Sequence, residues 1–160
     1  MSKVFVFACT GNIGRSPLAA AVARRRLAEA LGISETDLAG NGIEVTSVGT
    51  HAPPRFRAAR FAIAAGDEVG VDLRSHRSRR MNRKLAETVT RVYCMEQGQV
   101  EHLVAKYPVL EGKVEMLRPD GEPVPDPRGK DLDFHREVRE RIDEALGRRI
   151  PELVALVDDV

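Results

Sequence analysis

Apolar residues along the chain fall into four short runs that helical patterns separate. The runs cover residues 4–8, 43–48, 89–95 and 114–117. Short runs of this kind, rich in Val, Ile and aromatic residues, predict β-strands. The first run (Val-Phe-Val-Phe-Ala) has no polar position, which predicts a strand buried on both of its faces.

Four further segments have apolar residues at the spacing of an α-helix, every three to four positions. These segments are residues 16–31, 56–65, 97–107 and 131–157. We expect Phe56 to lie on the inner side of its helix. We also expect Pro151 to kink or split the last helix, because proline removes a backbone N–H donor. The basic stretch 74–83 has no apolar period and predicts a solvated loop.

Strands and helices alternate strictly in this reading, which predicts an α/β fold. We expect a single domain over residues 1–160, with a four-stranded parallel sheet flanked by helices on both faces. A chain of 160 residues is long enough to bury a core without disulfides or metals.

The composition of the chain limits the binding partners and the cellular compartment that we expect. The formal net charge is only +1, so we expect neither nucleic acid nor a membrane as partner. Two cysteines far apart in sequence fit a reducing compartment. We see no signal peptide at the N-terminus, so we expect a cytoplasmic protein. We also expect a monomer. The histidines and cysteines show no metal-ligand spacing, and we expect no metal and no cofactor.

The loop between the first strand and the first helix carries the clearest chemical signal. Residues 9–15 read Cys-Thr-Gly-Asn-Ile-Gly-Arg, and Ser16 and Pro17 then predict an N-cap and the first helical position. In open α/β sheets, ligands bind beyond the carboxyl ends of the strands, and a helix N-terminus there favours an anion. No Gly-Lys-Ser/Thr follows, so the loop is not that of a nucleotide hydrolase.

Cys9 and Arg15 predict that a chemical reaction takes place at this anion site. A thiolate is the nucleophilic form of cysteine, and a ring of N–H donors beside an arginine favours that form. Arg15 follows six positions later, and its planar guanidinium suits bidentate binding of a phosphate-like anion. The pattern therefore predicts a nucleophile combined with an anion clamp.

Residues 6–17 closely resemble the signature of the low-molecular-weight protein tyrosine phosphatases, and the resemblance extends over nearly the whole chain. The other matching stretches are Ser-Val-Gly-Thr at 47–50, His-Arg-Ser-Arg at 76–79, Tyr-Cys-Met at 93–95 and Val-Pro-Asp-Pro at 124–127. The resemblance implies hydrolysis of a phosphomonoester, with a phosphoprotein bearing phosphotyrosine as substrate, through a phosphocysteine intermediate.

The same resemblance assigns roles to individual residues. Cys9 attacks phosphorus, Arg15 stabilises the transferred oxygens, and Asp126 acts as the general acid. Ser16 donates a hydrogen bond to the thiolate, and Ser47 and His76 support the loop from behind. The substrate-binding residues are Thr10, Gly11, Asn12, Ile13, Gly14 and Ser16.

The sequence departs from the family at two places. Gly14 occupies a position where many members carry a second cysteine, so Cys9 is expected to be open to overoxidation unless Cys94 can reach it. Arg128 follows Asp-Pro where family members carry aromatic residues, which leaves phosphoarginine or a small phosphate ester as alternative substrates. Ile13 resembles the tyrosine-directed members, and we rank phosphotyrosine first.

Two other classes of function compete with this interpretation. Arsenate reductases share the fold, and a type that uses an external thiol would need only Cys9. A non-catalytic oxyanion-binding protein is the other class, but such proteins usually lose the nucleophile or the acid, and this chain retains both.

Overall fold

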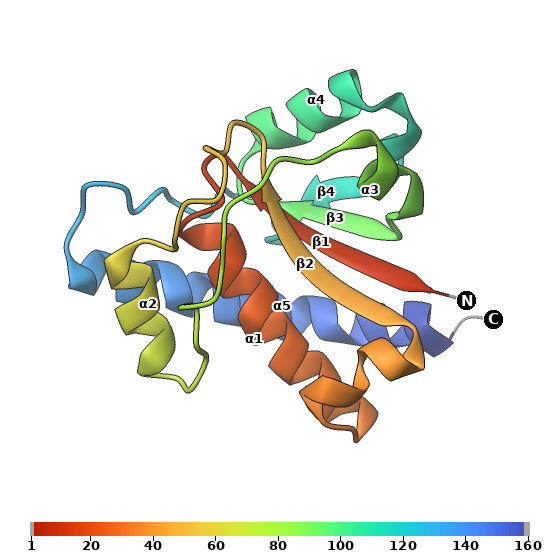
Figure 1. Cartoon of the computed structure of the whole chain (residues 1–160), viewed down its shortest axis with the longest axis horizontal. Helices are drawn as coiled ribbons and strands as arrows, with labels where there is room; N and C mark the ends of the chain where they lie inside the picture. Colours follow the sequence, from red (N-terminus) through yellow and green to blue (C-terminus); the bar gives the residue numbers. More distant parts are fainter. Residues whose placement is uncertain (1, 159–160) are drawn as a thin grey trace.

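A four-stranded, all-parallel sheet forms the centre of the molecule (Figure 1). The computed structural model describes residues 2–158. The strands are β1 (Lys3–Cys9), β2 (Ile43–Gly49), β3 (Arg91–Cys94) and β4 (Val114–Met116). Their order in the sheet is β2-β1-β3-β4, so β1 is a central strand. The first apolar run, residues 4–8, lies in β1 and is buried on both faces, as predicted.

Helices cover both faces of the sheet, as the alternating pattern predicts. The helices are α1 (Arg15–Leu31), α2 (Arg60–Asp67), α3 (Arg83–Thr88), α4 (Gln97–Lys106) and α5 (Leu132–Asp158). Short 3₁₀ turns occupy Glu35–Asp37, Ala39–Asn41 and Pro108–Leu110. Helices α1 and α5 pack together on one face, and α3 and α4 lie on the other (Figure 1).

The side chains of β1 alternate between two hydrophobic clusters, because successive residues of a strand point to opposite faces. Phe5 and Phe7 pack with residues of α1 and α5. Val4 and Val6 pack with residues of α3 and α4. The predicted α/β architecture with helices on both faces is therefore confirmed.

Two expectations for the segments after β2 are wrong. Phe56 is 56% exposed, and α2 begins only at Arg60. The backbone N–H and C=O of Phe56 bond to Ser78, which holds Phe56 in an extended loop outside the helix. The basic stretch is not simply solvated either, since Ser78 and Met81 in it are buried. Helix α3 follows at once, and the sequence reading missed it.

Pro151 does not split the last helix. Helix α5 is continuous across it, from Leu132 to Asp158. Ile150 and Leu153, on either side of the proline, are buried in the core that α5 shares with α1. This tertiary packing offsets the loss of one backbone hydrogen bond.

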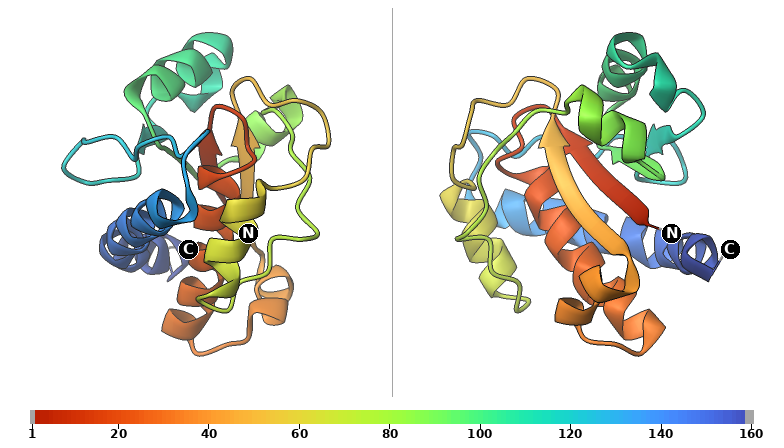
Figure 2. Two further views of the ribbon diagram at one scale, coloured as in Figure 1. Left: turned by 90° about the vertical axis from the view of Figure 1, so that its left-hand side faces the viewer. Right: turned by 45° about the vertical axis from the view of Figure 1, so that its right-hand side comes forward.

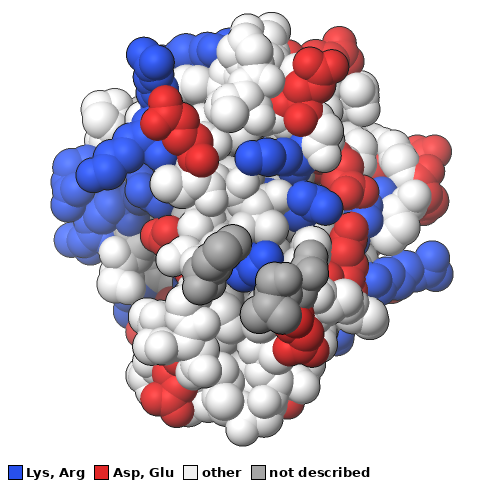
Figure 3. All heavy atoms as spheres, turned by 90° about the vertical axis from the view of Figure 1, so that its right-hand side faces the viewer, with Lys and Arg blue, Asp and Glu red and all other residues white. Residues whose placement is uncertain are grey.

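Charged side chains of both signs cover the surface around the termini. On the face shown in Figure 3, Lys and Arg gather along the left-hand edge, and acidic residues are more frequent on the right. The net charge of +1 is therefore not evenly distributed.

Leu146 of α5 tests the core between α1, α5 and the sheet, where it is fully buried. We expect Leu146→Ala to lower the free energy of unfolding by about 2–5 kcal/mol, through lost burial and a residual cavity. Val109→Ala is the control, because Val109 is 48% exposed. Urea denaturation of both variants would measure the difference, and equal losses would contradict this assignment of the core.

Candidate active site

The loop after β1 lies at the carboxyl edge of the sheet, between two other loops (Figure 2, left). The segment that follows β2 lies on one side of it, and the segment that leads into α5 lies on the other. Helix α1 begins at Arg15, with Gly14 at the N-cap and no side-chain capping bond. The expectation that Ser16 caps this helix is therefore wrong, because its hydroxyl is used elsewhere.

The hydroxyl of Ser16 lies against the Cys9 thiol. The Oγ of Ser16 lies 2.9 Å from the Sγ of Cys9, and the backbone N–H of Asn12 donates to the same sulfur at 3.2 Å. Cys9 is only 3% exposed, so these contacts replace water around the sulfur. The sulfur is therefore held in a fixed position by groups of the loop and of α1.

Asn12 is the residue that connects the loop to the rest of the molecule. It is fully buried and has a φ of 56°, in the left-handed region that asparagine tolerates better than most residues. Its Nδ2 donates to the Oγ atoms of Ser16 at 2.8 Å and Ser47 at 2.9 Å. Its Oδ1 accepts from the backbone N–H of Arg79 at 2.9 Å. All the hydrogen-bonding groups of this amide therefore have fixed partners.

His76 holds the same loop through its backbone. The Nε2 of His76 lies 2.6 Å from the carbonyl oxygen of Asn12, so Nε2 must carry the hydrogen. Burial lowers the pKa of His76, and the nearby guanidinium groups act in the same direction. The hydrogen bond to Asn12 opposes these effects but does not outweigh them, so the net shift is toward the neutral ring.

Gly49, at the end of β2, lets the second strand pass directly against the loop. A Cβ at this position would lie 2.5 Å from the carbonyl oxygen of Thr10 and 3.0 Å from the backbone nitrogen of Asn12. The next two residues donate their N–H groups to the loop, Thr50 to Cys9 at 2.9 Å and His51 to Thr10 at 3.0 Å. Only glycine allows this approach.

Arg15 is buried beneath the loop, with 3% of its side chain exposed. Its Nη1 donates to Glu96 Oε2 at 2.7 Å and to the carbonyl oxygen of Val124 at 2.9 Å. Its Nη2 lies 3.8 Å from Asp126 Oδ2. The sequence reading missed Glu96, although a carboxylate directly after the third strand falls at the edge where β1 also ends.

Asp126 lies at the mouth of the site. Its side chain is 52% exposed, and its Oδ1 accepts from the backbone N–H of Arg128 at 3.0 Å. A Cβ at Gly14 would lie 4.0 Å from the Cγ of Pro127, so the acid-bearing segment passes close to the loop. The structure thus brings Cys9, Arg15 and Asp126 to one edge of the sheet, as predicted.

The remaining loop residues have backbone and side-chain partners that position them. Thr10 Oγ1 accepts from Gln99 Nε2 at 3.1 Å, and the Ile13 carbonyl accepts from the Ala59 N–H at 2.7 Å. Gln99 is buried and was also missed, since nothing in the sequence links α4 to this loop. A Cβ at Gly11 would lie 3.6 Å from the Cγ1 of Ile13, which is an ordinary van der Waals distance.

Cys94 and Cys9 lie on opposite faces of the sheet. Cys9 belongs to the core cluster on the α1 face, and Cys94 belongs to the cluster on the α3 and α4 face. Cys94 pairs in register with Ala8, the neighbour of Cys9 that points the other way. Burial also raises the pKa of the Cys94 thiol, which keeps it protonated and unreactive.

Within residues 2–158 there is no cluster of three or more His, Cys, Asp or Glu side chains that could hold a metal ion. In the same part of the chain, no helix combines the length and the apolar character needed to cross a lipid bilayer.

A buried arginine and a cysteine ringed by donors, on the first loop of a parallel α/β sheet, define a site for nucleophilic attack on an oxyanion. The family model described as "Low molecular weight phosphotyrosine protein phosphatase" matches residues 4–156. The chain belongs to this family.

Named relatives include both tyrosine and arginine phosphatases. A probable low molecular weight protein-tyrosine-phosphatase, EpsP of Ralstonia nicotianae, is 27% identical over 98% of this chain and 99% of its own. The protein-arginine-phosphatase of Geobacillus stearothermophilus is 27% identical over 92% of this chain and 94% of its own. The crystal structure of a YwlE mutant from Bacillus subtilis superposes with a TM-score of 0.82 at 27% identity, covering 96% of this chain and 99% of the other.

Gly49→Ala tests the close approach of β2 to the loop. We expect the added Cβ to displace Thr10 and Asn12, lowering the activity about 100-fold and the stability by about 1–3 kcal/mol. Gly98→Ala is the matched control, because a Cβ at Gly98 meets nothing within 4 Å. Steady-state kinetics and thermal unfolding would measure both effects, and a Gly49→Ala enzyme with normal activity would refute the argument.

Cys94→Ala tests the separation of the two thiols. We expect the variant and the wild type to lose activity at the same rate in hydrogen peroxide, and to recover equally on addition of dithiothreitol. Residual activity and the mass of the Cys9 peptide would follow the oxidation. Recovery that is seen in the wild type and absent from the variant would show that a Cys9–Cys94 disulfide forms.

Proposed function

We propose that the protein hydrolyses phosphotyrosine in a protein substrate, in two steps that both use Cys9. The observation that carries the proposal is the sulfur of Cys9, held at 2.9 Å from Ser16 and 3.2 Å from the Asn12 N–H beside the buried Arg15. A buried thiolate in such surroundings suits covalent transfer of a phosphoryl group.

In the first step the Cys9 thiolate attacks phosphorus, and the bond from phosphorus to the phenolic oxygen breaks. Asp126, protonated at the start, donates its proton to that leaving oxygen. In the second step a water molecule attacks the phosphocysteine, and Asp126 takes one proton from it. The phosphorus–sulfur bond breaks, and inorganic phosphate and the Cys9 thiolate are released. Ser16 stabilises this thiolate as a leaving group.

Arg15 supplies the charge that this transfer requires. Glu96 and the Val124 carbonyl both bind Nη1, which fixes the plane of the guanidinium. Nε and Nη2 form no hydrogen bond within residues 2–158, so they remain free to bind two oxygens of the phosphoryl group. Fixed donors of this kind stabilise charge without reorganising during the reaction.

The rim of the site favours an aryl phosphate in an acidic sequence. Ile13, half-buried in the loop, offers an apolar contact to a ring. Arg55 and Arg57 are exposed in the segment that contacts Ile13, and Arg128 is exposed beyond Asp126. These cations attract acidic residues and repel the guanidinium of phosphoarginine. Phosphoarginine remains the second candidate, because relatives of both kinds match this chain at equal identity.

We further propose that the protein acts in the cytoplasm as a monomer, without a cofactor. Two free, buried cysteines and a thiolate nucleophile suit a reducing compartment. The reaction needs no group beyond the side chains named above.

Hydrolysis of an aryl phosphate in the presence of a metal chelator tests the mechanism. We expect Cys9→Ser to abolish turnover and Asp126→Asn to lower kcat by about 10²–10⁴-fold. Asp120→Asn is the matched control, because Asp120 is exposed in the same segment and pairs with Arg118. Activity that survives in Cys9→Ser would overturn the proposal.

A second comparison decides the substrate. We expect higher kcat/KM for phosphotyrosine peptides than for phosphoarginine peptides of matched sequence, and a further gain when acidic residues flank the phosphotyrosine. The opposite order would assign the protein to the arginine-directed group. If the reduced, folded wild type hydrolyses neither, arsenate reduction with an added thiol becomes the activity to measure.

A further inference from the structure

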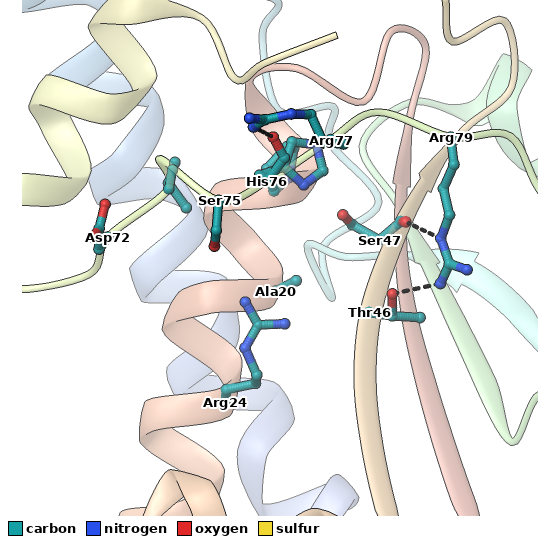
Figure 4. A pocket seen from close by; sticks show the side chains of 11 residues that line it. Ala20, Arg24, Thr46, Ser47, Asp72, Ser75, His76, Arg77 and Arg79 are labelled. Carbon is teal, nitrogen blue, oxygen red and sulfur yellow. Dashed lines mark hydrogen bonds between the residues drawn. The ribbon is translucent and has the colours of Figure 1, made fainter. Parts of the chain in front are cut away.

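A second polar cavity lies behind the catalytic loop. It has a volume of about 120 Å³ and opens between α1, β2 and the segment 72–79. Figure 4 shows Arg24 rising from α1 into this space, with Ser47 and Arg79 on one side and Ser75 and His76 on the other. The Cys9 sulfur is not part of its lining.

The cavity carries an excess of positive charge. Arg24, Arg77 and Arg79 line it, and in residues 2–158 no carboxylate lies within 4.0 Å of their guanidinium groups. The one acidic lining residue, Asp72, is already paired with Arg74 at 3.0 Å. Three guanidinium groups that have no carboxylate partner within residues 2–158 are thus gathered around one small cavity.

Two of these guanidinium groups are held in place by neutral oxygens. Arg24 Nη1 donates to the Val45 carbonyl at 2.9 Å, and Arg79 Nη2 donates to Thr46 Oγ1 at 2.6 Å. Burial lowers the pKa of Arg24, because its charge is partly removed from water. An anion in the cavity would compensate both charges, and the fixed positions reduce the entropy lost on binding.

Ser47 contributes a further donor. Its side chain lines the cavity and is 6% exposed. Its Oγ accepts from Asn12 Nδ2, and its own hydroxyl hydrogen has no acceptor among residues 2–158. The hydroxyl hydrogen of Ser47 can therefore turn toward an oxygen atom in the cavity.

We propose that this cavity is a second oxyanion site, which binds inorganic phosphate or the phosphate group of a small ester. The cavity of about 120 Å³ has room for one phosphate group between these side chains. Arg24, Arg79 and the Ser47 hydroxyl are the donors that would hold the oxygens.

Occupancy of this site would act on the catalytic loop from behind. Ser47 and His76 line the cavity and also bind Asn12, the residue that holds the Cys9 loop. An anion bound here would therefore restrain Asn12. This consequence rests on the proposed function, whereas the binding itself does not.

Calorimetric titration with inorganic phosphate tests the site without any turnover. Carboxymethylation of Cys9 places a carboxylate in the catalytic loop. Cys94 is less reactive toward the reagent, because it is fully buried and burial raises the pKa of its thiol. We expect one phosphate to bind to the carboxymethylated wild type, and binding at least about tenfold weaker after Arg24→Gln combined with Arg79→Gln. Arg83→Gln is the control, because Arg83 is exposed and lies outside the cavity.

Each result of these titrations either supports the proposed site or overturns it. No binding to the carboxymethylated wild type, or undiminished binding to the double variant, would overturn the proposal. Chloride at equal ionic strength measures general screening of charge, and equal heats from chloride would identify an adventitious ion only. O-phosphoserine is titrated in parallel: tighter binding than inorganic phosphate assigns the site to an ester, and weaker binding assigns it to free phosphate.

Discussion

The buried side chain of Asn12 is the constraint on which the site depends. One amide group binds Ser16 in the following helix, Ser47 in β2 and the Arg79 backbone in the segment beyond α2. These partners come from parts of the chain that are distant in sequence. Their convergence keeps Asn12 at a φ of 56° and turns its N–H toward Cys9. A loop with several glycines and little side-chain bulk would otherwise have many conformations available.

The charge of Arg15 is the second constraint, because a buried guanidinium must have partners. Glu96 and the Val124 carbonyl supply them from two different connections at the same sheet edge. This arrangement links the loop after β3 and the segment that carries Asp126 to the nucleophile. The three segments that would take part in the reaction are thus connected through one side chain.

Alternation along β1 separates the two thiols. Cys9 and Cys94 both end strands at the same edge of the sheet, and their side chains point to opposite faces. The fold therefore places the proposed nucleophile and the second thiol on opposite sides of the sheet. If the cavity behind the loop binds phosphate, the bound anion would contact Ser47 and His76, and both of these residues bind Asn12 of the catalytic loop. Binding in the cavity and binding in the loop would then be coupled.

The sequence by itself determined the four strands, the parallel sheet with helices on both faces and the loop from Cys9 to Arg15, because local periodicity and a short contiguous motif carry that information. It did not determine that Ser16 binds the thiol rather than capping α1, that Phe56 faces solvent, or that α5 continues through Pro151. It also gave no indication of Gln99 or of the unpaired arginines around the second cavity. Each of these depends on contacts between residues far apart in the chain, and only the tertiary structure decides which polar groups meet and which charges remain without a partner.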